Sequence, residues 1–308
     1  MSSDRDEFEF GELPQSGRGR RPPKRQFGAF ILALLTRVSL VVVWRGTTGG
    51  DRNSAQAVTG SPASSAAILS PPPGGPSPGA EPGLAPQLQK IVDLGKPVYC
   101  GGGNLPMVAL TFDDGPGPYT QYTVDTLKTA GAKATFFLVG KLFNSSTNQK
   151  ESKVEAKFGD VGDHSWNHFG LAGKSVATLD AEIVRPRKII EKYSGEDVVY
   201  FRPPWGSRDS ALDAFVASQG MIEMMWTFDT HDSEGAKTDE IVSSIDKQAQ
   251  PGSIILLHEN RGTTRSALPA ILQVLAAKGL QPVTLTTLLT QDPPTTKQLK
   301  HGQSGCYA

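Results

Sequence analysis

The sequence lacks several features, and each absence narrows the range of functions. Its 31 basic and 31 acidic residues give a formal net charge of zero, so charge provides no general reason to expect nucleic-acid binding. No glycine-rich phosphate-binding pattern follows the first strand-like segment, and we therefore expect no nucleotide site. No internal repeat is visible, which leaves an ordinary globular domain as the expectation for the larger part of the chain.

Cysteine is scarce, with two residues in the chain. Cys100 lies just before the first strand-like segment, and Cys306 lies in the tail. Outside the cell, a disulfide between them would tie the tail to the entry of the domain. Two free thiols are the alternative, and the sequence leaves both open.

Composition divides the 308 residues into five segments. They are a basic cytoplasmic leader (1–26), an apolar segment (27–44), a linker rich in Pro, Gly, Ser and Ala (45–86), a globular domain (87–291) and a polar tail (292–308). The linker has almost nothing to bury, so we expect a flexible spacer. The domain has roughly 200 residues, enough for one core, and we expect it to be a monomer.

The apolar segment 27–44 follows a cluster of arginines and lysines, which orients it with the N-terminus inside and the domain outside the membrane. Arg37 opposes insertion by about 2.5–3.5 kcal/mol, whereas each large apolar residue favours it by about 0.3–0.6 kcal/mol. We expect an uncleaved membrane anchor. A signal peptide cleaved after Ala55-Gln56-Ala57 is the alternative, and both place the domain outside the cytoplasm.

Strand-like and helix-like segments alternate along the domain. Expected strands are 107–112, 134–140, 198–201, 221–228, 252–258 and 282–289, the last ending in a turn. Expected helices are 118–131, 175–195, 209–220, 238–249 and 264–279. Ser175, Asp209 and Thr238 are the expected N-caps, and Pro186 is expected to bend its helix. This alternation predicts a parallel sheet with helical crossovers.

Unusual polar residues follow the carboxyl ends of several strands, namely Asp113, Asp114, Arg202, Asp229 and His258. Strands that are distant in sequence can direct their ends to one point only if the sheet curls, and barrels gather their sites at that face. An open doubly wound sheet would use a single crevice instead. We therefore predict a (β/α) barrel.

The segment "HSWNH" places His164 and His168 four residues apart, so in a helix or a single turn both imidazoles can reach one metal ion. With Asp114 they form a common catalytic ligand set, for which zinc is the first expectation and non-haem iron(II) a competitor. Asp113 would then be the neighbouring unligated carboxylate that accepts a proton, with Arg202 holding it in place.

His258 ends the apolar run "SIILL" at the same converging face, where it can act as a general acid. Such a histidine needs an orienting carboxylate, and Asp229 is the expected one. His231, Asp232 and His301 are interpreted as solvated or local turn residues.

Five segments, "TFDDGP", "HSWNH", "RPPWG", "DTHD" and "ILLH", occur in this order and resemble the signature motifs of NodB-type polysaccharide deacetylases, the fourth carbohydrate esterase family. The resemblance covers residues 105–289 and is specific as an ordered set. It implies a distorted (β/α) barrel with a single catalytic domain. It also implies removal of acetyl groups from N-acetylated or O-acetylated glycans with one divalent metal ion, usually Zn²⁺, with Co²⁺, Mn²⁺ or Ni²⁺ as alternatives.

The resemblance also implies a role for each matching residue. The implied catalytic residues are Asp113 as base, Arg202 as its clamp, His258 as acid and Asp229 as the residue that tunes it; the metal ligands are Asp114, His164 and His168. The implied substrate-binding residues are Leu256 against the acetyl methyl group, Trp205 with its backbone N–H on the oxyanion, and their neighbours Pro204 and Gly206.

Two positions depart from the family pattern. Ser233 stands where an aromatic residue is usual, which removes a wall from the site and changes the expected substrate preference. Asp163 stands where asparagine is common, and it adds a negative charge that could support a ligand or alter metal affinity.

These observations predict an extracytoplasmic, surface-exposed deacetylase that acts on an amino-sugar polymer. Peptidoglycan is the first expectation, ahead of chitin oligomers. An O-acetyl esterase on a xylan-like polysaccharide and a non-catalytic glycan-binding barrel are the rival interpretations. An iron oxygenase would have no use for Asp113 or His258.

Overall fold

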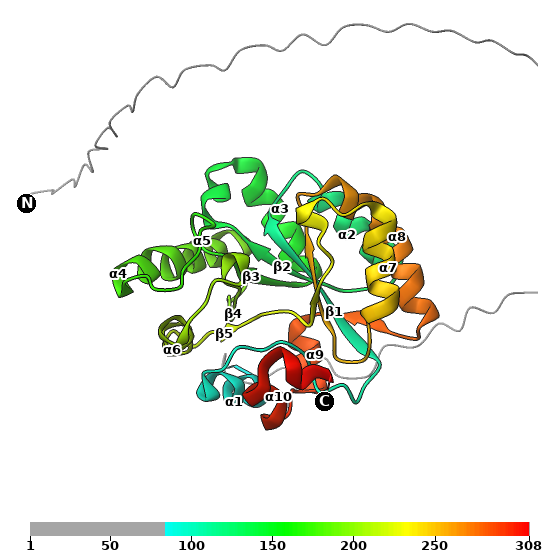
Figure 1. The fold of residues 1–308 in the computed structure, drawn as a ribbon. Coiled ribbons are helices and arrows are strands. Elements are labelled where there is room, and N and C mark those ends of the chain that lie inside the picture. Colours follow the sequence, from blue (N-terminus) through cyan, green and yellow to red (C-terminus); the bar gives the residue numbers. More distant parts are fainter. Residues whose placement is uncertain (1–83, 308) are drawn as a thin grey trace, which may run out of the picture. The chain divides into compact units, whose positions relative to one another are not determined.

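The computed structural model describes residues 84–307 (Figure 1). The predicted leader 1–26, the apolar segment 27–44 and all but the last residues of the linker 45–86 lie outside the described residues. Within residues 84–307, no helix is long and apolar enough to cross a membrane. The membrane anchor and the signal peptide therefore both remain predictions.

The described residues form one parallel sheet of eight strands, in the order β5-β4-β3-β2-β1-β7-β6 with β8 paired to the start of β1. The strands are β1 (Met107–Gly115), β2 (Thr135–Leu138), β3 (Asp160–Asp163), β4 (Tyr200–Phe201), β5 (Ile222–Glu223), β6 (Phe228–Asp229), β7 (Ile254–His258) and β8 (Gln281–Val283). β1 is central because it pairs with β2, β7 and β8.

The sheet curls but does not close. Its edge strands β5 and β6 follow one another in the sequence, and the described pairings include none between them. A curled parallel sheet that stays open between its edge strands is a distorted barrel, so the predicted distorted (β/α) barrel in a single domain is confirmed. The expected single strand 221–228 is wrong: it is two short strands, because the carbonyl oxygens of Met224 and Met225 turn away to accept hydrogen bonds from Arg202.

Helices cover the outside of the sheet and one of its ends (Figure 1). Their bounds are α1 (Pro86–Leu94), α2 (Thr120–Thr129), α3 (Ser146–Phe158), α4 (Val176–Leu179), α5 (Arg185–Ser194), α6 (Ser210–Ser218), α7 (Thr238–Gln248), α8 (Gly262–Ala277), α9 (Leu285–Gln291) and α10 (Thr296–His301). The elements that were not expected are α1, α3, α9, α10 and β3. The expected last strand 282–289 is wrong beyond Val283, because Leu285–Gln291 forms the helix α9.

Two of the three expected N-caps are confirmed. The Ser175 hydroxyl accepts from the Thr178 N–H, and the Asp209 carboxylate accepts from Ala211 and Leu212. Thr238 is not the cap of α7, since the helix is capped one residue earlier at Lys237, whose N–H donates to Glu240.

The expected bend at Pro186 takes the form of a π-helical turn, Asp180–Val184, between α4 and α5. Proline has no N–H to donate, so the carbonyl of Glu182 four residues earlier is left free. That carbonyl accepts from the N–H of Trp166 instead, which anchors the segment containing the predicted histidine ligands.

Successive side chains of β1 point to opposite faces of the sheet and belong to two separate hydrophobic clusters. Val108, Leu110 and Phe112 belong to the larger cluster, beneath the outer helices. Met107 and Ala109 point the other way, into a second cluster with residues of α1, α9 and α10. These three helices close the amino end of the curled sheet and leave its carboxyl end free for a site.

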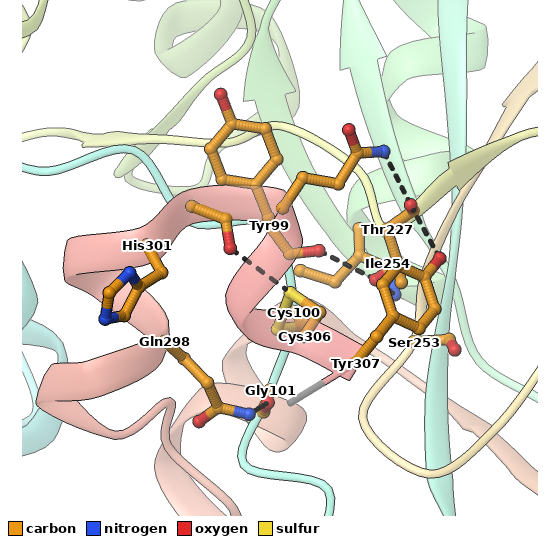
Figure 2. Close-up of a disulfide and its surroundings, with 12 residues drawn as sticks. Tyr99, Cys100, Gly101, Thr227, Ser253, Ile254, Gln298, His301, Cys306 and Tyr307 are labelled. Atoms are coloured by element: carbon orange, nitrogen blue, oxygen red, sulfur yellow. Dashed lines mark hydrogen bonds between the residues drawn. A yellow bond between two sulfur atoms is a disulfide. The ribbon is translucent and has the colours of Figure 1, made fainter.

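The segment 292–308, expected as a polar tail, is folded against the domain over its described residues. Leu299 of α10 is buried in the second cluster, and the Asp292 carboxylate accepts the backbone N–H groups of Asn104 and Leu105. Cys100 and Cys306 form a disulfide, so the first of the two alternatives for the cysteines is correct (Figure 2).

The disulfide lies at the amino end of the strands, where the Tyr307 hydroxyl also donates to the carbonyl of Thr227 (Figure 2). It joins residues 206 positions apart and therefore restricts the unfolded chain strongly. We expect the Cys100→Ser/Cys306→Ser variant to lose about 2–5 kcal/mol of unfolding free energy, measured by denaturant titration. Unfolding free energy equal to that of the parent chain under oxidising conditions would contradict this expectation.

Candidate active site

Strand register brings the base and acid candidates together. β1 and β7 are paired so that Asp113 lies opposite His258, and the N–H of Glu259 donates to the carbonyl of Asp113. Asp113 is buried and His258 is half-buried. Two residues 145 positions apart therefore share the carboxyl end of adjacent strands, as the sequence predicts.

The three predicted metal ligands also converge. Ligand atoms of Asp114, His164 and His168 all lie within 4.8 Å of one another. The Asp114 Oδ1 atom is 3.0 Å from His168 Nε2 and 3.8 Å from His164 Nε2. The segment that carries the histidines is a tight turn and not a helix: Ser165 and His168 have positive φ, and the His168 N–H donates to the Ser165 hydroxyl.

A hydrogen bond at one ring nitrogen of His164 determines which of its two nitrogens is available to bind a metal ion. Its Nδ1 lies 2.8 Å from the carbonyl oxygen of Arg202, so Nδ1 carries the proton and Nε2 keeps its lone pair toward Asp114. Burial lowers the pKa of His164 in spite of the two neighbouring carboxylates. Burial raises the pKa of Asp114, but the hydrogen bond to His168 and the nearby histidines outweigh burial and hold it well below its usual range.

This donor set fits a divalent metal ion. A neutral imidazole with an oriented Nε2, a second imidazole and an ionised carboxylate are the ligands that zinc and related cations prefer. Three protein ligands leave further coordination positions open, which is typical of catalytic sites. The donor types alone do not select one ion among Zn²⁺, Co²⁺, Mn²⁺ and Ni²⁺.

Arg202 is fully buried and lies beside Asp113, as expected. Its Nη1 is 2.8 Å from Asp113 Oδ1 and also donates to the Thr111 hydroxyl. Burial lowers the pKa of Arg202, opposed by the charge of Asp113. The ion pair holds one oxygen of Asp113, while Oδ2 faces His164 Nε2 at 3.6 Å.

The expected partner of His258 is wrong. Its Nδ1 is 2.7 Å from Asp232 Oδ1, and Asp232 also accepts the backbone N–H of His258 and the Thr264 hydroxyl. Asp229 instead accepts the backbone N–H of His231, so its carboxylate is directed into the local turn.

Asp232, interpreted from the sequence as a solvated or local turn residue, is buried. The two carboxylates are three positions apart in "DTHD", and the second reaches the imidazole because a 3-10 turn, Asp232–Glu234, follows the strand. The presence of two aspartates three positions apart on either side of His231 was the available signal, but it does not say which carboxylate faces inward.

Of the predicted substrate-binding residues, Trp205 has a direct contact with the ligand cluster. Trp205 is 73% exposed, and its ring meets that of His168 edge-on at 5.0 Å between centroids. Pro204 and Leu256 are both buried. A Cβ at Gly206 would lie 3.1 Å from the Trp226 ring, and its φ is +62°, so a larger residue would be strained there.

The two departures from the family pattern have different consequences. Ser233 is half-buried on the turn after Asp229, beside the partner of His258. Asp163 is fully buried and its Oδ1 accepts the N–H of Ser165, which stabilises the histidine turn. Burial raises the pKa of Asp163 well above its usual value, so an added negative charge, as expected from the sequence, is disfavoured.

The carboxyl end of the open parallel barrel thus carries a candidate metal-ligand set, a clamped carboxylate and a carboxylate-oriented histidine. This combination is typical of metal-dependent hydrolases. Comparison with known proteins identifies the family. A family model for polysaccharide deacetylase matches residues 101–225. A peptidoglycan-N-acetylglucosamine deacetylase of Bacillus cereus is 34% identical over 193 residues, which cover 60% of this chain and 89% of that protein.

Two further similar proteins, one of them a solved structure, are also named as deacetylases. A peptidoglycan-N-acetylmuramic acid deacetylase of Bacillus subtilis is 33% identical over 186 residues, or 60% of this chain and 39% of that protein. The crystal structure of a peptidoglycan N-acetylglucosamine deacetylase with a naphthyl N-oxidanyl-benzamide has a TM-score of 0.59 at 30% identity, and the match covers 64% of this chain and 94% of that one. The chain belongs to the polysaccharide deacetylase family, family 4 of the carbohydrate esterases.

The pairing of His258 with Asp232 can be tested by titrating the imidazole. Burial lowers the pKa of His258, but the hydrogen bond to Asp232 and the nearby carboxylates raise it above its usual value. Asp232→Asn removes a negative charge that stabilises the imidazolium, so the pKa of His258 is expected to fall, as read from its proton chemical shifts. Asp229→Asn is the matched control, and a larger fall in that variant would restore the partner expected from the sequence.

Proposed function

We propose that this chain is a metal-dependent hydrolase that removes acetyl groups from N-acetylated amino-sugar polymers. The observation that carries the proposal is the joint placement of Asp113 and His258 on adjacent strands beside the Asp114, His164 and His168 ligands. Hydrolysis of an acetamide needs an activated water, a stabilised oxyanion and a proton for the departing amine. The site offers a separate group for each need.

Asp113 is the proposed general base. Its Oδ1 is bound by Arg202, and Oδ2 is directed toward the ligand cluster, where it can accept a proton from the attacking water. The bond from Arg202 fixes the orientation of the carboxylate, so the same oxygen is presented to the water in each turnover.

His258 is the proposed general acid that gives a proton to the amine as the C–N bond breaks. Asp232 on Nδ1 leaves Nε2 to face the reacting atoms and stabilises the imidazolium. The pKa of His258 is raised, so the acid form persists to higher pH than for an ordinary histidine, and activity falls as pH rises through that pKa.

Asp114, His164 and His168 would hold the metal ion, with zinc as the first choice and Co²⁺, Mn²⁺ or Ni²⁺ as alternatives. The ion, when bound, would lower the pKa of water and polarise the acetyl carbonyl. The backbone N–H of Trp205 is the proposed second oxyanion donor, and its exposed ring offers a stacking surface for a sugar. Leu256 is the residue proposed to contact the acetyl methyl group.

The proposed substrate is cell-wall peptidoglycan, at N-acetylglucosamine or N-acetylmuramic acid, ahead of chitin oligomers. Both peptidoglycan activities occur among the relatives described above. The Cys100–Cys306 disulfide supports an oxidising, extracytoplasmic location, which agrees with the anchor or signal peptide proposed for residues 27–44.

Acetate release by the metal-stripped chain, before and after addition of zinc, tests this function. We expect zinc to restore release from peptidoglycan or from chitin oligomers. Release from acetylated xylan alone would favour an O-acetyl esterase. No release from any of the three by protein with full metal content would favour a glycan-binding role.

The base assignment predicts that Asp113→Asn lowers kcat by at least about a hundredfold, the usual contribution of a general base, while metal content measured by atomic emission stays unchanged. Asp239→Asn, at an exposed position of α7, is the matched control and should keep parent activity. Near-parent turnover in Asp113→Asn would show that another group accepts the proton.

A further inference from the structure

The two histidine ligands lie on a turn that belongs to no helix or strand. Ser165 and His168 both have positive φ, at 66° and 60°. Such a conformation is uncommon for residues other than glycine, so contacts from outside the turn must hold it in this form. The residues that bind the turn between His164 and His168 therefore determine how the two imidazoles are placed.

One buried side chain binds the middle of this turn. Glu182 is 3% exposed, and its carboxylate accepts two hydrogen bonds from Asn167, the residue directly before His168. The backbone N–H of Asn167 lies 2.8 Å from Oε2, and its Nδ2 lies 2.7 Å from Oε1. Because both oxygens are engaged, the carboxylate fixes the orientation of Asn167 as well as its distance.

The backbone around Glu182 binds the same turn. Its carbonyl oxygen, which is left free by Pro186, accepts the N–H of Trp166 at 3.0 Å. The guanidinium of Arg185 lies 3.7 Å from the centre of the Trp166 ring. Glu182 itself belongs to the π-helical turn Asp180–Val184, and such turns are rare and frequently occur at functional sites.

The other contacts of the turn hold its carbonyl groups and do not replace Glu182. Lys141 donates from its backbone N–H to the carbonyl of Trp166 and from Nζ to the carbonyl of Asn167. Among the described residues, the N–H groups of Trp166 and Asn167 are accepted by Glu182 alone. Loss of the carboxylate would therefore release the residue that carries His168.

We propose that Glu182 is a positioning residue for the metal ligands. Through Asn167 it sets the distance and angle between His164 and His168, and thereby determines how tightly the site binds a divalent ion. This rests on the metal site proposed above and adds a residue from outside the five motifs. Both oxygens of Glu182 are engaged by Asn167, so it acts through the turn and not as a ligand.

Glu182→Gln in the full chain tests the proposal. The glutamine amide keeps the size of the side chain, but it cannot accept a hydrogen bond at both ends, so its NH₂ group faces one donor of Asn167. We expect the Kd for Zn²⁺, measured by competition with a chromophoric chelator, to rise by about 10- to 100-fold, the usual effect of losing a partner that orients a ligand. The visible absorption of the Co²⁺-loaded variant should also differ from the parent spectrum, because it reports coordination geometry.

A second substitution should restore the contact with one bond reversed. In Glu182→Gln/Asn167→Asp, the glutamine oxygen can accept the backbone N–H of residue 167, and its NH₂ group can donate to the new carboxylate. The net charge equals that of the parent chain. We expect this double variant to bind Zn²⁺ more tightly than Glu182→Gln by about fivefold or more, since residues in direct contact are coupled.

Two further variants keep the test decisive. Asn167→Ala, at an exposed position, removes one of the two bonds and should raise the Kd for Zn²⁺ by about two- to tenfold, the range of a single hydrogen bond, even if Glu182→Gln does not fold. Glu191→Gln is the matched control, because that carboxylate pairs with Arg187 and does not contact the histidine turn; it should keep the parent Kd.

A parent-like Kd in both Glu182→Gln and Asn167→Ala would overturn the proposal. So would a double variant that binds Zn²⁺ no better than Glu182→Gln. If Glu182→Gln lowers only the unfolding free energy of the metal-free chain, Glu182 serves the fold and does not position the ligands. A parent chain that binds no zinc would instead refute the metal site itself, which separates the two failures.

Discussion

The buried contact between Arg202 and Asp113 is the interaction on which the site depends. Arg202 has no exposed surface, and its guanidinium reaches Asp113, the Thr111 hydroxyl and the carbonyl oxygens of Met224 and Met225. Its backbone carbonyl also fixes the tautomer of His164. Removing one partner of a buried ion pair costs about 3–5 kcal/mol, so base, ligand and strand ends are held as one unit.

The two adjacent aspartates acquire different roles from this arrangement. Asp113 ends the regular part of β1 and is turned toward Arg202, whereas Asp114 has a positive φ that turns it toward the histidines. The proposed metal ligand and the proposed base therefore point in different directions, although they are neighbours in the chain. On the other side, the pairing of β1 with β7 brings His258 to the same point, and Asp232 orients it. The proposed acid and the proposed base therefore lie on adjacent strands.

Much of this could be predicted from the sequence, because polar residues after strand ends and ordered motifs are local signals. The barrel, the ligand set and the Arg202 clamp follow from them. Other features depend on contacts between distant residues. The break after Glu223 arises from carbonyl groups that bond Arg202, and the folded tail depends on Cys306 reaching Cys100. The sequence predicted Asp229 as the partner of His258, whereas the structure has Asp232 there. Spacing alone does not distinguish the two, since a single 3-10 turn decides which carboxylate reaches the imidazole.

A crystal structure of the chain grown with zinc, with the ion located by anomalous scattering, tests the different roles of the two aspartates most directly. We expect one ion bound by Asp114, by His164 Nε2 and by His168 Nε2, with Asp113 still paired to Arg202. An ion bound through Asp113, or an ion found only at the exposed group of Asp229, His231 and Glu234, would contradict the division of roles between the two aspartates.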